Sequence, residues 1–66
     1  MNELDALRCA KIMLDRHGDD AEAQATLRAD ALAEEGDVPG RDAWRRIRAA
    51  IGELRRTARR PGEGLQ

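Results

Sequence analysis

The chain has 66 residues, no phenylalanine or tyrosine, one tryptophan, and a formal net charge of −1 at pH 7. A chain of this length forms one domain and buries only about 60% of the surface that its unfolded form exposes. The lone cysteine excludes an internal disulfide, and one cysteine with one histidine is too few for a structural zinc site. We therefore expect the fold to be stabilised by self-association or by docking on another protein.

The apolar side chains are numerous but small. Alanine accounts for 12 of the 27 apolar residues, and it favours helices while burying little area. No segment alternates as a strand would, so we expect an all-α fold: a compact unit of three helices that self-associates. The predicted core residues are Leu7, Leu14, Leu27, Leu32, Trp44, Ile47, Ile51 and Leu54.

The first helix is predicted over residues 3–17. Asn2 is a favourable N-cap, and acidic residues follow it in the first turn, where they favour the helix dipole. Gly18 supplies a left-handed stop. At about 100° per residue, the apolar side chains spread over a face wider than one neighbouring helix can cover. This excess predicts either a central position for the helix or a second contact across an oligomer.

The second helix is predicted over residues 20–35. Asp19 and Glu22 are spaced like an acidic version of a capping box. The larger apolar residues of this helix, Leu27 and Leu32, lie on different faces, and alanines fill most of the remaining positions. Such a helix is marginal in isolation, so packing against its neighbours must hold it.

The third helix is predicted over residues 38–60, with Asp37 as its N-cap and Pro61 as its stop. Its apolar residues recur at intervals of three and four, which places them in a single stripe. Residues 1–60 thus form the predicted domain, and residues 61–66 form a flexible C-terminal tail.

Opposite charges separate the two parts of the chain. Residues 1–40 sum to −6 and residues 41–60 sum to +6. Projected on the third helix, six arginines share one face with no acid between them, and this face is the candidate partner-binding surface. The six are Arg41, Arg45, Arg48, Arg55, Arg56 and Arg59. The alternative is that acids of the first two helices neutralise this face within the fold.

No residue pattern indicates catalysis or a bound cofactor. Cys9 and His17 lie about two turns apart on one predicted helix, too far for a nucleophile and its base. The stretch His17-Gly18-Asp19-Asp20 has metal-binding residue types, but the ends of two helices need the same residues. No glycine pattern matches a phosphate-binding loop. We therefore predict a protein that is not an enzyme and that uses no cofactor or metal.

A set of short motifs follows in order along the chain. They are Ala10, His17-Gly18-Asp19-Asp20-Ala21, Arg28-Ala29-Asp30-Ala31-Leu32, Gly36-Asp37-x-x-Gly40, Trp44-x-x-Ile47 and Ala50-Ile51-x-Glu53-Leu54. In this combination, the chain resembles a family of short, uncharacterised, all-helical hypothetical proteins of proteobacteria, over most of residues 6–64. The resemblance implies a helical fold and a cytoplasmic location, and it transfers no activity. Within it, we expect Arg28 and Asp30 to hold the second helix to the following turn by an ion pair or cap.

Together these features predict a small non-enzymatic interaction or accessory protein that binds through its second and third helices. The free cysteine favours a reducing compartment, and the acidic N-terminus is unlike a secretory signal, so the predicted location is the cytoplasm. No apolar run approaches the ~20 residues of a membrane span, so no membrane contact is expected. The predicted partner is a second copy or another protein. Two alternatives stay open: a nucleic-acid-binding module that uses the arginine face, and a structural homodimer subunit.

Overall fold

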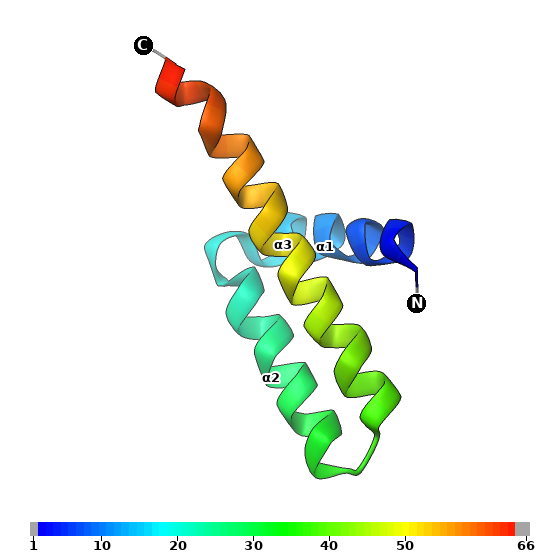
Figure 1. Cartoon of the computed structure of the whole chain (residues 1–66). Helices are drawn as coiled ribbons and strands as arrows, with labels where there is room; N and C mark the ends of the chain where they lie inside the picture. The colour runs from blue at the N-terminus through cyan, green and yellow to red at the C-terminus, as the bar shows by residue number, and fades with distance from the viewer. Residues whose placement is uncertain (1, 65–66) are drawn as a thin grey trace.

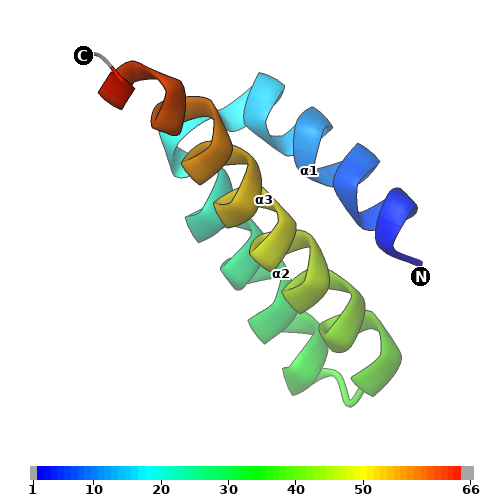
Figure 2. The same ribbon diagram turned by 45° about the horizontal axis from the view of Figure 1, so that its top comes forward.

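The computed structural model describes the backbone of residues 2–64 and the side chains of residues 2–58. The described part is helical throughout except at its short turns (Figure 1). The elements are α1 (Glu3–His17), the short 3-10 helix η1 (Gly18–Asp20), α2 (Ala21–Glu34) and α3 (Val38–Gly64). Helices α2 and α3 run antiparallel side by side (Figures 1 and 2). Helix α1 crosses α3 obliquely in the view of Figure 1 and runs beside it in that of Figure 2.

The predicted all-α class is confirmed, whereas the prediction of three separate helices is confirmed only in part. Helices α1 and α2 meet through η1 without a non-helical residue between them, so residues 3–34 form one helical run that bends. The bend is at Gly18, where φ is 56° and the amide donates to the carbonyl oxygen of Leu14. The predicted cap of α1 is also confirmed, because Oδ1 of Asn2 accepts from the amide of Asp5 at 2.8 Å.

The turn between α2 and α3 accounts for the spacing of its two glycines. Gly36 has φ of 83°, a value that residues with a side chain rarely adopt. Asp37 caps α3 as predicted, since its Oδ1 accepts from the amide of Gly40 at 3.0 Å. A Cβ at position 40 would collide with the same carboxylate. The backbone conformation thus favours glycine at position 36, and the capping carboxylate of Asp37 favours glycine at position 40.

The core of the molecule is built mostly from alanine. Its buried residues are Ala6, Ala10, Met13, Ala21, Ala25, Ala29, Ile47 and Ile51. Three of the alanines recur every fourth residue along α2, so they form a narrow stripe of small side chains on one face. Small side chains let helix axes approach closely, and the two isoleucines of α3 then fill the centre.

The structure buries two of the predicted core residues of α3 and exposes one of those predicted in α2. Ile47 and Ile51 are buried, and Leu14, Trp44 and Leu54 are half-buried against the core. Leu7 and Leu32 are half-buried outside this cluster.

The prediction that Leu27 belongs to the core is wrong, because Leu27 is 61% exposed. Helix α2 turns its alanine stripe, which includes Ala25, toward the other helices. At about 100° per residue, Leu27 therefore lies on the far side.

The predicted end of the third helix is also wrong. We expected Pro61 to stop the helix after residue 60, but α3 continues to Gly64. A proline has a φ near the helical value. It removes the hydrogen bond to the carbonyl of residue i−4 and crowds that carbonyl, so it weakens a helix without always ending it. The predicted tail over residues 61–66 is thus helical as far as Gly64, and its last two residues lie outside the described part. The C-terminal turns of α3 project beyond α1 and α2 (Figure 1).

Candidate functional site

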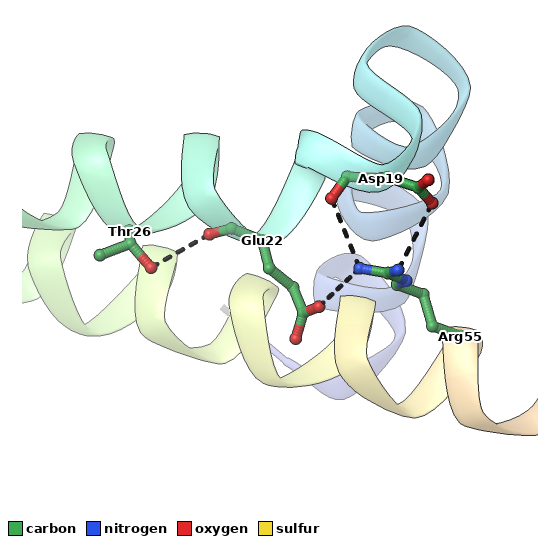
Figure 3. Close-up of polar contacts among 4 residues, drawn as sticks. All are labelled: Asp19, Glu22, Thr26 and Arg55. Atoms are coloured by element: carbon green, nitrogen blue, oxygen red, sulfur yellow. Dashed lines mark hydrogen bonds and ion pairs between the residues drawn. The ribbon is translucent and has the colours of Figure 1, made fainter.

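Arg55 joins α3 to the bend between α1 and α2 (Figure 3). Its Nη1 donates to Oε1 of Glu22 at 2.9 Å and to the backbone carbonyl oxygen of Asp19 at 3.5 Å. Its Nη2 lies 3.4 Å from Oδ1 of Asp19. The planar guanidinium presents several N–H groups in a fixed fork, so one side chain can serve two carboxylates and a carbonyl. The bridge fixes where α3 lies against the start of α2.

This bridge replaces the predicted capping box. Helix α2 has Asp20 as its N-cap residue without a side-chain cap, and Oδ2 of Asp20 accepts instead from Nε2 of Gln24 at 2.9 Å. Asp19 and Glu22 both bind Arg55, because a charged donor makes a stronger hydrogen bond to a carboxylate than a neutral amide does. The spacing of the two acids did not reveal this role, since their partner lies 36 and 33 residues away.

Two further arginines of the predicted face are paired with acids of their own helix. Nη2 of Arg41 lies 3.0 Å from Oδ1 of Asp42, and Arg56 pairs with Glu53 one turn earlier. The charge of Arg55 is thus neutralised by acids that precede α3, as the alternative prediction stated. The charges of Arg41 and Arg56 are instead neutralised by acids of α3 itself. Surface pairs contribute only about 0–1 kcal/mol each, so their main effect is to lower the positive charge of the face. The side chain of Arg59 lies outside the described part.

Arg45 and Arg48 remain open to a partner. Both are exposed, and neither makes an ion pair within the described part of the chain. With Arg56 they line a shallow hollow of about 350 Å³ on α3, which Glu22 and Glu53 also line. The phosphates of a nucleic acid favour a continuous positive surface, whereas this hollow carries both signs of charge.

A second hollow lies between α1, α2 and α3, and we call it the Trp44 hollow. Its volume is about 190 Å³. Four of its lining residues are apolar and three are basic types, and no carboxylate lines it among the residues that the structure describes. They are Cys9, Ile12, Met13 and Trp44, with Arg16, His17 and Arg28.

Arg28 reaches this hollow from α2 and lies over the Trp44 ring. Its Cζ is 5.0 Å from the ring centroid, within the range of a cation–π contact. Arg28 thus connects α2 to α3 through its contact with the Trp44 ring. Within residues 2–58, the predicted ion pair or cap does not form this connection. Asp30 is exposed and makes no ion pair in the described residues. Sequence spacing gave no signal for a contact between Arg28 and Trp44.

Cys9 and His17 line the same hollow, but no hydrogen bond joins them in the part of the chain that is described. Nor do three His, Cys, Asp or Glu side chains gather there as metal ligands. Of the helices within residues 2–64, none combines the length and apolarity needed to cross a membrane. Comparisons with protein-family models, curated proteins and solved structures return no match. Function must therefore be inferred from the residues of the chain itself.

The Arg55 bridge leads to a first prediction. Replacing Arg55 by alanine should lower the free energy of unfolding by about 1 kcal/mol, because its partly exposed ion pair with Glu22 is lost, while the fully exposed carboxylate of Asp19 adds little. For a domain of this size, 1 kcal/mol corresponds to a Tm lower by about 4–8 °C. Replacing Arg56 by alanine is the matched control, since it removes only a pair within one helix and should cost less than about 0.5 kcal/mol.

Thermal melts followed by far-UV circular dichroism measure both variants. The difference between wild type and Arg55→Ala should shrink in high salt, because salt screens partly exposed charges. Equal melting temperatures for the two variants would show that the bridge does not hold α3 to the bend.

Proposed function

We propose that the chain is a non-enzymatic protein-interaction module that binds through a surface on α2 and α3. The proposal rests on which apolar residues are buried. Alanine fills much of the core, whereas several larger apolar side chains are exposed on the surface. About half or more of each of four large apolar residues is exposed: Leu4 56%, Ile12 52%, Leu27 61% and Val38 49%. A partner that covers such residues would add the apolar burial that a small core lacks.

The free positive charges of α3 support a protein as the partner. Leu27 lies on α2 and Val38 begins α3, while Arg45 and Arg48 supply free positive charge on α3. Protein interfaces commonly combine apolar anchors with a polar rim, and rim charges select the partner. An acidic surface with an apolar anchor is the chemistry that this combination would recognise.

The proposal places the protein in the cytoplasm, together with the short proteobacterial proteins that its motifs resemble. A free, half-buried cysteine supports a reducing compartment. The proposal assigns no catalytic residue, because the only nucleophile–base candidate in the described part, Cys9 with His17, makes no hydrogen bond. It also assigns no cofactor.

A charge reversal tests this surface. The variant with Arg45→Glu and Arg48→Glu should lose a protein that the wild type retains from a native cytoplasmic extract, because the acidic partner is then repelled. Its circular dichroism should be unchanged, since neither arginine has an ion pair in the described chain. The matched control reverses Arg8 and Lys11, two exposed cations of α1. This control should retain the same protein.

The retained protein is identified by mass spectrometry and its binding is then measured with purified components. Undiminished binding to the reversed variant would contradict the proposed surface. A second candidate function, nucleic-acid binding, is favoured by the same two unpaired arginines. Treating the extract with nuclease separates the two functions. Loss of the retained material after that treatment, together with binding that falls steeply with salt, would favour nucleic acid.

A further inference from the structure

The Trp44 hollow has a chemistry that restricts its occupant. At about 190 Å³, it is smaller than the ~300–1,000 Å³ of most ligand pockets. One apolar side chain is therefore a better occupant than a cofactor or a metabolite. Its apolar wall is bordered by Arg16 and Arg28, and no carboxylate lines it within the described residues. The occupant should thus be an apolar side chain that is flanked by acids.

The outer side of α2 carries such a side chain. Leu27 is 61% exposed there, and the residues one turn before and after it are exposed alanines. At about 100° per residue, the exposed acids Asp30 and Glu34 share this side, and the exposed Asp20 lies just before it in η1, so the side is acidic and centred on one leucine. We call it the Leu27 face, and it consists of Asp20, Ala23, Leu27, Asp30, Ala31 and Glu34.

We propose that a second copy of this chain docks here, with Leu27 of each copy in the Trp44 hollow of the other. The inference rests on the proposed function, because it assigns a partner to Leu27, one of the exposed apolar residues on which that function is argued. The acidic Leu27 face complements the basic border of the hollow, which favours this encounter over contact between two like-charged surfaces. The small alanines on either side of Leu27 let α2 approach closely enough for the leucine to enter.

The position of the two surfaces suits a closed dimer. Arg28, which borders the hollow, is the residue directly after Leu27 in α2. A two-fold axis beside α2 therefore brings both surfaces of one copy against both surfaces of the other, and neither is left free to add a third copy. The two α2 helices then form the centre of the interface.

Trp44 reports directly on this docking. It is the only tryptophan and the chain has no tyrosine, so the fluorescence comes from the hollow itself. When the chain is concentrated from the low micromolar to the millimolar range, we expect sedimentation to show a monomer becoming a dimer. The Trp44 emission should shift to shorter wavelength over the same range, because Leu27 excludes water from the ring. A monomer throughout this range would overturn the proposal.

Substitution of Leu27 tests the contact. Leu27→Lys should raise the dimer Kd at least about tenfold, since it removes the apolar anchor and places a positive charge beside Arg16 and Arg28. Leu4→Lys is the matched control, because Leu4 is an equally large residue that is 56% exposed and lies outside both surfaces. It should leave the Kd within about threefold of wild type, as neutral interface contacts do. A Kd unchanged by Leu27→Lys, or a dimer without a shift in Trp44 emission, would place the interface elsewhere and overturn the proposal.

A charge exchange tests the orientation. Arg16→Glu and Asp30→Arg should each weaken the dimer, and the two together in one chain should restore it, because opposite signs meet again across the interface. Failure of the combined variant to recover would contradict the docking. The result is independent of the extract experiment. A monomeric chain that still retains a protein through Arg45 and Arg48 would refute the dimer and leave the proposed function standing.

Discussion

Replacing Ile51 by alanine is expected to remove most of the stability of the monomeric chain. Ile51 is fully buried in the core cluster, where most of its buried neighbours are alanines that cannot close over a gap. Truncating a buried isoleucine costs about 2–5 kcal/mol, including the cavity that it leaves. A core of this size supplies about 3–5 kcal/mol in all, so one substitution removes most of the stability.

Urea unfolding followed by circular dichroism measures the loss. Ile12→Ala is the matched control, because it is the same substitution at a residue that is 52% exposed. In dilute protein, where no dimer contributes, we expect this control to change the free energy of unfolding by less than about 0.5–1 kcal/mol. Cooperative unfolding of Ile51→Ala at nearly the wild-type urea concentration would contradict a core centred on the two isoleucines of α3.

The helix ends were predictable because they depend on local chemistry. The side chains of Asn2 and Asp37 accept hydrogen bonds from amides three residues later, and Gly18 stops α1. Each of these contacts is fixed by neighbours in the sequence. Pro61 is the exception, because a proline weakens a helix without prohibiting it.

The packing of α2 was not predictable from residue size. We expected its leucines to be buried because larger side chains bury more area. Instead, Ala25 faces the core and Leu27 faces outward. The choice between the two faces depends on how closely α2 approaches α3, and that distance is a property of the assembled molecule. Sequence periodicity gives the stripes of a helix but does not say which stripe is inside when alanine and leucine compete.

The arginine face was predictable as a set but not in its pairing. Periodicity placed the six arginines together, yet among the side chains that the structure describes, some of them form ion pairs with acids and others do not. Arg55 is held by acids 33 and 36 residues away, whereas Arg45 and Arg48 are exposed without an ion pair in the described part. Long-range ion pairs require the tertiary arrangement. The same arrangement gives the Trp44 hollow, whose lining residues come from three helices.

The buried alanine stripe of α2 leads to a second prediction of a large loss of stability. Replacing Ala25 by leucine should destabilise the fold by about 1–3 kcal/mol, because a fully packed site must move apart to admit three more carbons. Ala25 is completely buried, whereas Ala23, two residues earlier in the same helix, is exposed. Ala23→Leu is therefore the matched control, with the same added volume and the same helix. It should change the free energy of unfolding of the dilute monomer by no more than about 0.5 kcal/mol.

Chemical unfolding of both variants decides how tightly α2 lies on its neighbours. If Ala25→Leu were as stable as wild type or more so, the buried stripe would contain unfilled space, and close approach of the helices would not explain why alanine lies inside. A loss confined to Ala25→Leu would show that small side chains are required at the contact. Leu27 could not then exchange places with an alanine by rotation of α2, since its larger side chain would force the helices apart. The exposure of Leu27 thus follows from the packing of the monomer, and the leucine is left available to a partner.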